Sequence, residues 1–305
     1  MHAKFTLPPG TLTHMLRGGA LRSLRPTCAI LAAWTRPMST AATSPSTAST
    51  GAIIYEGQRA VDEYVQMHFG APSDVFPYGS GATDGLAFPE RCANAVISAF
   101  ADAGRDPAGC AALDVGCAVG GASFALAKHF ARVDGVDFSA AFVAAARTLQ
   151  AEGQLDYAAL VEGTRTETRT AHLTHAGPSS GSVTFSQGDA CALEALRDTG
   201  TLKAEGYDAV LASNLLCRLP RPRAFLRSCA DWLVQPGGTL VLLTPFSWLE
   251  AWTPQSEWIG GGDLNSSEEL AREMAALGFT RASRTDVPFL IREHARKFQC
   301  VVRSR

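Results

Sequence analysis

The stretch that most constrains the fold of this chain is an apolar run that leads into a glycine-rich turn, residues 112–122 with the sequence ALDVGCAVGGA. A second apolar run follows and ends at Asp137. A strand that turns through glycines into a helix, followed by another strand, is the repeating unit of parallel sheets flanked by helices. Strand-like and helix-like segments keep alternating after residue 57. We therefore predict an α/β, Rossmann-like fold with a mostly parallel, seven-stranded sheet, formed by one domain over 51–305.

Hydrophobic periodicity, proline and glycine locate the expected elements. The expected strands are 110–115, 133–137, 182–186, 207–212, 240–244, 279–285 and 297–303. The expected helices are 58–69, 89–103, 121–131, 140–150, 192–199, 222–234 and 267–277. Residues 156–173 predict a polar, threonine-rich hairpin, followed by a loop tip at 174–181.

Charge and cysteine usage exclude several functional classes. Residues 1–55 hold five basic residues and no acid, which leaves 22 of the 27 basic residues against all 29 acidic ones in the remainder, a balance of −7. A mildly acidic body lacks the basic stripe of a general nucleic-acid binder. The eight cysteines form no C-x-x-C pair, so we expect neither a metal site nor disulfides. We also expect no membrane span, because the apolar run at 28–34 is far shorter than the roughly 18 residues required.

The first 50 residues differ from the rest in composition. They are acid-free, bear arginines, and are rich in serine, threonine and alanine, which is typical of organellar transit peptides. We expect residues 1–50 to be a targeting peptide and linker, directing the protein to a mitochondrion or a plastid, with the mitochondrion favoured. A secretory signal, or an untargeted extension on a cytoplasmic protein, is the alternative.

The glycine loop by itself fits two cofactors. Gly116, Ala118 and Gly121 match the G-x-G-x-x-G loop of dinucleotide-binding folds with one glycine replaced, and Asp137 lies 21 residues beyond Gly116. Gly116, Ala118 and Gly120 match equally well the D-x-G-x-G-x-G loop of enzymes that use S-adenosylmethionine, again with one replacement. The loop alone therefore does not decide between them.

Three further features favour S-adenosylmethionine. Asp114 ends the first strand, where a carboxylate suits a cofactor with an ammonium group better than a pyrophosphate. Asp189 follows the third strand and is placed to accept from the adenine amino group, although it could also cap the next helix. The turn Pro236-Gly237-Gly238 before the fifth strand is usual in such methyltransferases. The predicted cofactor-binding residues are Asp114, Gly116, Ala118, Gly120, Asp137, Phe138, Asp189, Ala190 and Asn214.

Beyond this loop the chain resembles the 4-mercaptohistidine N-methyltransferase family, the methyltransferase domain at the C-terminal end of the bifunctional ovothiol biosynthesis enzyme. The similarity covers nearly all of residues 57–302, although a glycine-rich insertion at 78–85 interrupts it. Its most distinctive segments are LTPFSWLE at 243–250, WIGG at 258–261 and DVPFLIREHARKFQ at 286–299. Cys217 stands where family members carry aspartate. The chain contains no H-x-x-x-H-x-E run of the iron-dependent sulfoxide synthase half, so a separate synthase would have to act upstream.

The resemblance implies an N-methyltransferase that acts on the imidazole of 5-thiohistidine to give ovothiol A. Such a zwitterion requires partners for its carboxylate and its ammonium group. We expect Arg292 and Arg296 to bind the carboxylate, Glu293 the ammonium group, and Asn214 the imidazole edge, although the charged run could equally be a solvated surface. The alternatives are methylation of another small amine, imidazole or thiol, and a methyltransferase-like binding protein without catalysis.

Overall fold

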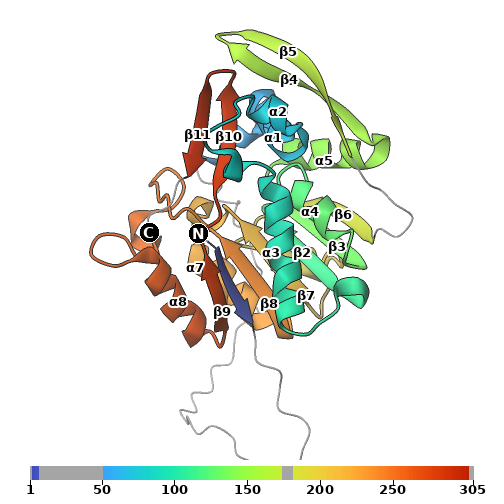
Figure 1. Ribbon diagram of the computed structural model, residues 1–305. Coiled ribbons are helices and arrows are strands. Elements are labelled where there is room, and N and C mark those ends of the chain that lie inside the picture. Colours follow the sequence, from blue (N-terminus) through green and yellow to red (C-terminus); the bar gives the residue numbers. More distant parts are fainter. Residues whose placement is uncertain (1, 7–50, 174–180, 302–305) are drawn as a thin grey trace, which may run out of the picture.

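The computed structural model describes residues 2–6, 51–173 and 181–301 (Figure 1). Its centre is a seven-stranded sheet with the strand order β6-β3-β2-β7-β8-β1-β9. The neighbours from β6 to β8 are all parallel, which confirms the predicted Rossmann-like α/β fold. The strands of this sheet are β1 (His2–Thr6), β2 (Ala111–Val115), β3 (Arg132–Asp137), β6 (Ser182–Gln187), β7 (Tyr207–Ser213), β8 (Val234–Leu243) and β9 (Thr280–Thr285).

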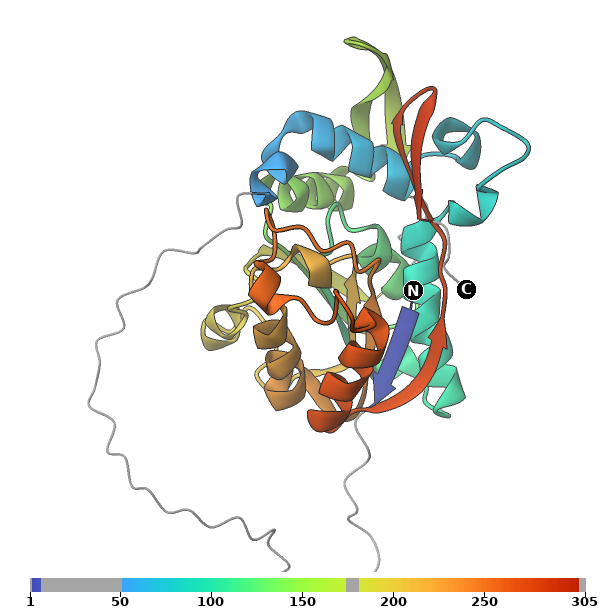
Figure 2. The same cartoon turned by 90° about the vertical axis from the view of Figure 1, so that its left-hand side faces the viewer.

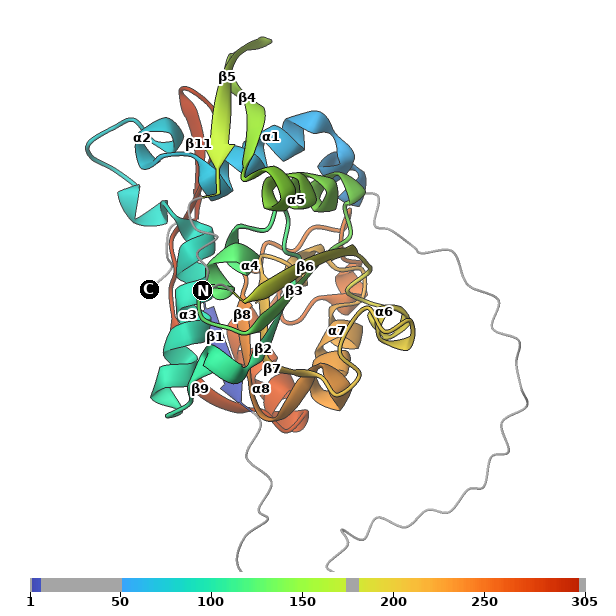
Figure 3. The ribbon, with the colours of Figure 1, turned by 90° about the vertical axis from the view of Figure 1, so that its right-hand side faces the viewer.

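Helices cover both faces of the sheet. Successive side chains of β2 point to opposite faces of the sheet. Ala112 packs with α3 and α4, whereas Leu113 and Val115 pack with α7 and α8. Figure 3 shows α3 on one side of the sheet and α6 and α7 on the other. The helices are η1 (Ala52–Glu56), α1 (Gln58–Phe69), α2 (Pro72–Val75), η2 (Thr83–Gly85), α3 (Phe88–Asp102), η3 (Pro107–Gly109), α4 (Gly121–Leu126), α5 (Ala140–Glu152), α6 (Glu194–Asp198), η4 (Leu216–Arg218), α7 (Pro222–Ser228), η5 (Cys229–Leu233), η6 (Gln255–Glu257) and α8 (Ser266–Ala276).

Local sequence sets the ends of α5, the helix that follows β3. The helix begins after Ser139, whose hydroxyl accepts the backbone N–H of Phe142 at 3.1 Å and so caps the first turn. It ends at Gly153, which takes the left-handed conformation at φ +73°. This helix therefore runs from Ala140 to Glu152, close to the predicted range.

The strand order reverses between β2 and β7. From β2 the chain continues outward to β3 on one side, whereas β7 and β8 extend the sheet on the other. At such a point the connections leave in opposite directions and open a crevice at the carboxyl ends of the strands. Asp114 near the end of β2 and Asn214 just after β7 flank this crevice.

Two antiparallel hairpins stand outside the central sheet. The predicted polar hairpin is present as β4 (Gln154–Glu162) and β5 (Arg165–His172), which project beyond the body of the molecule (Figure 1). The segment 174–180 of the expected loop tip lies outside the described residues. Residues 297–303 were expected to form one of the two closing strands of the central sheet, together with 279–285. Instead β11 (Lys297–Val301) pairs with β10 (Phe289–His294), because a short turn folds the two segments back on each other.

The strand β1 was not predicted from the sequence. It belongs to the segment expected to be a targeting peptide, yet it lies between β8 and β9 and pairs antiparallel with both. Residues 7–50 of that segment lie outside the described residues. Processing between about residues 38 and 57 would remove β1 from the sheet. Within the described part of the chain, no helix is long and apolar enough to cross a bilayer.

Candidate active site

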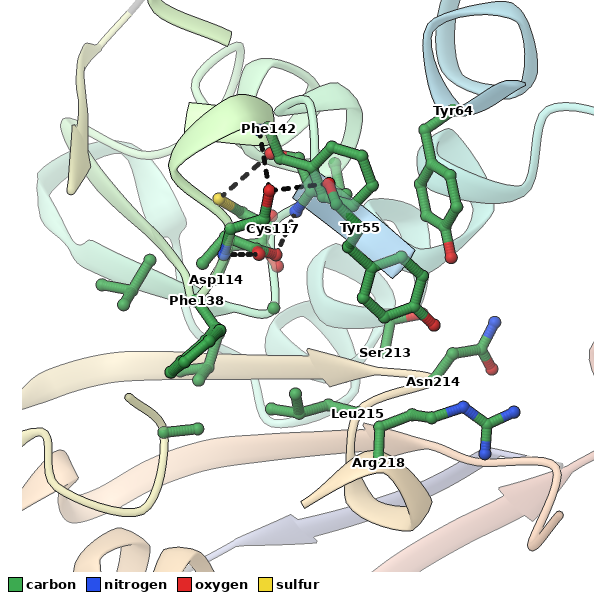
Figure 4. Close-up of a pocket in the computed structure, with 18 of the residues that line it drawn as sticks. Tyr55, Tyr64, Asp114, Cys117, Phe138, Phe142, Ser213, Asn214, Leu215 and Arg218 are labelled. Carbon is green, nitrogen blue, oxygen red and sulfur yellow. Dashed lines mark hydrogen bonds between the residues drawn. The ribbon is translucent and has the colours of Figure 1, made fainter. Parts of the chain in front are cut away.

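A cavity of about 1180 Å³, partly open to solvent, lies over the carboxyl ends of β2, β3, β6 and β7. Figure 2 shows the segment formed by η1 and α1 lying above the sheet, and residues of both line the cavity. Figure 4 shows Asp114 and Phe138 on one side of the cavity and Asn214 and Arg218 on another.

The glycine loop between β2 and α4 has the backbone geometry that close approach to a ligand requires. Gly116 and Gly120 have φ of +77° and +89°, which favours glycine. Ala118 has φ of +48°, an uncommon conformation for a residue with a Cβ. Its N–H donates to Oδ2 of Asp137 at 2.8 Å, which holds the loop against the end of β3. The replaced glycine of the motif therefore keeps the loop conformation at the cost of local strain.

Two carboxylates lie beneath this loop, Asp114, which is buried, and Asp137, which is half-buried. Asp114 is almost fully buried and accepts the hydroxyl of Ser123 at 2.6 Å, and burial raises its pKa to about 7. Burial also raises the pKa of Asp137 to about 6, although the backbone N–H groups of Ala118 and Ser139 donate to it. Both carboxyls are therefore close to their protonation midpoints near neutral pH, and a cationic or hydroxyl-bearing ligand would favour their ionised forms.

A third acidic residue, Asp189, lies after β6. Its Oδ1 accepts the N–H of Cys191 at 2.8 Å, so one oxygen of the carboxylate stabilises the local turn. This matches part of the structural role that the sequence left open. Asp189 also lines the cavity, together with Ala190.

Eight of the nine predicted cofactor residues line this one cavity. These are Asp114, Gly116, Ala118, Asp137, Phe138, Asp189, Ala190 and Asn214. Gly120 is the exception, because it does not line the cavity. A Cβ on Gly120 would lie 2.7 Å from the ring of Phe185, so this glycine is required by packing under the loop.

Four aromatic side chains, Tyr55, Tyr64, Phe142 and Trp252, also line the cavity, and we call them the aromatic wall. The ring of Tyr55 lies 5.2 Å from that of Trp252, and the ring of Tyr64 lies 4.7 Å from that of Phe142. Neither Tyr55 nor Tyr64 was predicted to be a site residue, although Tyr64 lies in the predicted helix 58–69. Their position in η1 and α1 identifies the segment that covers the cavity.

His68 of α1 also lines the cavity, and one hydrogen bond sets which of its ring nitrogens carries the proton. Its Nδ1 accepts the N–H of Gly121, the first residue of α4, at 3.0 Å. Burial lowers the pKa of His68 to about 3, so the ring is neutral. With Nδ1 accepting, the proton is on Nε2, and His68 acts as a hydrogen-bond donor.

Two polar residues that follow β7 complete the lining. Asn214 has φ of +52°, which asparagine tolerates well, and it lies at the carboxyl end of the strand as predicted. Arg218 of η4 was not predicted to be a site residue. Its guanidinium lies 5.2 Å from the ring centre of Trp252, a contact between residues that are far apart in the sequence.

The residues predicted to bind the substrate lie elsewhere. Arg292, Glu293 and Arg296 belong to the β10–β11 hairpin, and none of them lines the cavity. Arg292 is 5% exposed and donates to the backbone carbonyl of Asp74, whereas Glu293 accepts from Gln299 at 2.6 Å. Arg292 thus contacts α2, and Glu293 contacts the paired strand β11. The proposed substrate contacts of these three residues stay a prediction.

Comparison with known proteins identifies the class of this fold and site. Residues 113–240 match the family described as a methyltransferase domain. The ubiquinone biosynthesis O-methyltransferases of Xanthomonas axonopodis pv. citri and Xanthomonas oryzae pv. oryzae are each 28% identical over 163 residues, which is 53% of this chain and 54% of theirs. The chain thus spans about half the length of these curated relatives.

Solved structures are also similar, at lower identity. Magnesium protoporphyrin IX methyltransferase from Synechocystis PCC 6803, solved with bound SAH, has 16% identity and a TM-score of 0.47, over 79% of this chain and 93% of that one. An amino pentose methyltransferase from Micromonospora echinaspora, solved with bound SAM, has 21% identity and a TM-score of 0.35, over 52% and 51%.

Residues 113–240 therefore form the core of a methyltransferase domain, and its cofactor is S-adenosylmethionine. The family match supports the S-adenosylmethionine interpretation of the glycine loop over the dinucleotide interpretation. The cavity lining includes the residues predicted to bind this cofactor, Asp114, Gly116, Ala118, Asp137 and Asp189.

Proposed function

We propose that this protein transfers a methyl group from S-adenosylmethionine to a ring nitrogen of 5-thiohistidine, giving ovothiol A. The observation that carries the proposal is the composition of the cavity: a wall of acidic residues and glycine faces a pocket of aromatic rings, one amide and one guanidinium. The similarity of segments 243–250 and 286–299 to the 4-mercaptohistidine N-methyltransferase family supports the choice of substrate. A separate iron-dependent sulfoxide synthase would supply that substrate.

The acidic wall fits the cofactor group by group. Asp137 would accept from the ribose hydroxyls, Asp189 from the adenine amino group, and Asp114 would pair with the ammonium group. When bound, the cofactor supplies a methyl group on a positively charged sulfur. The protein's main contribution is to hold the nucleophile roughly 3–3.5 Å from that methyl group and to exclude water.

The opposite wall fits a flat heteroaromatic acceptor. The faces of Tyr55, Tyr64 and Trp252 can pack against a ring, and the amide of Asn214 can bind its polar edge. His68 is a donor, and the pKa of Tyr64 lies well above its usual range because of burial, so Tyr64 stays protonated. These groups position an acceptor and do not deprotonate it. An imidazole nitrogen already carries a lone pair at neutral pH and needs no base.

O-methylation of a phenol is the second candidate, favoured by the similarity to the ubiquinone biosynthesis O-methyltransferases. A phenol must lose its proton before or during attack. The lone pair of the His68 imidazole already accepts the N–H of Gly121, so His68 is not free to take the proton of a phenol. This lining therefore supports N-methylation better than O-methylation.

Mass spectrometry of the reaction product tests the proposal. Full-length protein incubated with S-adenosylmethionine and 5-thiohistidine should give a product one methyl group heavier, and fragmentation should locate the methyl group on the ring nitrogen nearer the side chain. Histidine should react much more slowly, because it lacks the sulfur atom and would leave the polar groups that bind this sulfur without a partner. Methyl transfer to sulfur, or equal turnover of histidine, would reject the thiohistidine assignment. Methylation of a catechol in place of either compound would favour the second candidate.

A further inference from the structure

Arg218 is a cation on the cavity wall whose charge is not neutralised within the described part of the chain. Its Nη1 donates to the carbonyl oxygens of Cys217 at 3.1 Å and Ser247 at 2.9 Å. Neither acceptor carries a formal charge, and no carboxylate among the described residues forms an ion pair with this guanidinium. Its Nη2 and Nε have no hydrogen-bond partner among those residues. The N–H donors of Nη2 and Nε are therefore available to a ligand.

The guanidinium is nevertheless held in place. The ring of Trp252 lies 5.2 Å from its central carbon, and Trp252 is 7% exposed and packs against Tyr55. The two carbonyl contacts fix the Nη1 end of the same group. A planar guanidinium that is already oriented loses little conformational freedom when it binds a carboxylate through two parallel hydrogen bonds. Arg218 is therefore held in an orientation that suits the binding of a carboxylate.

The charges of the cavity are separated by side. Asp114 and Asp137 lie by the glycine loop, where the positively charged cofactor fits. Figure 4 shows the guanidinium of Arg218 beside the amide of Asn214, with the hydroxyl of Tyr64 above them and Asp114 on the far side. The side that faces the acceptor thus presents one positive charge and several neutral donors. This arrangement complements an acceptor with a negative charge.

We propose that Arg218 binds the carboxylate of the methyl acceptor, so that this enzyme selects small heteroaromatic or aromatic acids. The proposal rests on methyl transfer in this cavity, but it does not require that the acceptor be 5-thiohistidine. Arg218 takes the role that the sequence assigned to Arg292 and Arg296. Asn214 then binds the ring edge, and the aromatic wall packs against the ring.

The test compares matched acceptors with and without a carboxylate, using full-length wild-type protein and the variants Arg218→Gln and Arg218→Lys. The first pair is 5-thiohistidine and its decarboxylated amine. Wild-type protein should prefer the acid by at least about tenfold in kcat/KM, and Arg218→Gln should raise the KM of the acid by about 10–100-fold until the two acceptors are equal. Arg218→Lys should restore part of the preference, because it keeps the charge but not the paired hydrogen bonds.

Two controls separate this role from others. Arg221→Gln changes an exposed arginine that does not line the cavity, and it should preserve the preference for the acid. Affinity for S-adenosylhomocysteine, measured by calorimetry, should be the same in wild-type protein and Arg218→Gln. Loss of that affinity would overturn the proposal, because Arg218 would then bind the carboxylate of the cofactor. An unaltered preference in Arg218→Gln would overturn it as well.

The outcome stays informative if 5-thiohistidine is not the acceptor. Two further pairs, imidazole-4-acetate with 4-methylimidazole and 3,4-dihydroxybenzoate with catechol, are then assayed in the same way. A preference for the acid of either pair that is lost in Arg218→Gln supports the carboxylate site while the thiohistidine assignment fails. A preference for the uncharged member, no preference, or no reaction and no binding with any pair overturns it.

Discussion

At the scale of single residues, the pKa values of the two carboxyl groups under the glycine loop predict how cofactor binding depends on pH. Burial raises the pKa of Asp114 to about 7 and that of Asp137 to about 6 in the unliganded protein. S-adenosylmethionine should favour their ionised forms, so its affinity should rise with pH through these values. Below its pKa each group must first lose a proton, at a cost of about tenfold in affinity for each pH unit.

Calorimetric titrations at pH 7.5 and 5.5 check this expectation. Affinity should fall by at least about tenfold at the lower pH. Asp114→Asn, which cannot ionise at this position, should bind more weakly at pH 7.5 and should show a flatter profile. An affinity of the wild-type protein that does not change between the two pH values would contradict the assignment of these carboxyls to the cofactor.

The site residues differ in whether they could be predicted from the sequence. Asp114, Asp137 and Asp189 could be predicted because each follows a strand, and the carboxyl ends of parallel strands meet at one edge of the sheet. Arg218 could not be predicted in this way. It lies in the short η4, and its position on the cavity wall depends on Trp252, a contact that no local pattern reveals.

At the scale of elements, the contact between α1 and α4 joins the covering segment to the glycine loop. A Cβ on Gly121 would lie 2.5 Å from Nδ1 of His68, so Gly121→Ala should displace the imidazole and with it α1. Such overpacking costs about 1–3 kcal/mol. Because α1 also carries Tyr64, we expect weaker binding of S-adenosylhomocysteine, by about tenfold, together with a lower Tm.

The matched control is Gly109→Ala. Its Cβ would meet nothing within 4 Å, and its backbone lies outside the left-handed region. This variant should therefore bind S-adenosylhomocysteine like the wild-type protein. Calorimetry and thermal unfolding of both variants distinguish the two substitutions. Equal affinity in Gly121→Ala and Gly109→Ala would show that the α1–α4 contact does not shape the site.

Elements with strong periodicity were predicted well, and elements that depend on distant pairing were not. The helix α1 was predicted over 58–69 and is observed from Gln58 to Phe69, because its apolar positions recur on one face. The hairpin β10–β11 was missed in part, because the pairing of these two segments was not predicted. The residues 286–299 are distinctive in sequence, but sequence does not show which partner a strand pairs with.

At the scale of the whole molecule, β1 predicts a cost for removing the N-terminal segment. It contacts both β8 and β9, and its loss would leave two unpaired strand edges in the sheet. Protein truncated to residues 51–305 should therefore lose about 2 kcal/mol of stability, or roughly 4–8 °C in Tm. It should still bind S-adenosylhomocysteine, because the cavity lies over other strands.

Thermal unfolding of the full chain and of 51–305 measures this cost. An equal Tm for both proteins would contradict the contribution of β1 to the sheet. The same comparison bears on the expected targeting peptide, since a mature protein that begins near residue 51 must be stable without β1. A fluorescent fusion of residues 1–50 that enters an organelle, with the native protein starting between about residues 38 and 57, would support that proposal.

The central claim is that the cavity over β2, β3 and β7 binds S-adenosylmethionine, and calorimetric titration tests it most directly. The full chain should bind S-adenosylmethionine and S-adenosylhomocysteine but not NAD. Asp137→Ala should weaken binding by about 1.5–3 kcal/mol through loss of a charge-assisted acceptor, whereas Asp198→Ala, at an exposed position, should not. Binding of NAD in place of S-adenosylmethionine, or equal affinity in wild-type protein and Asp137→Ala, would contradict the account.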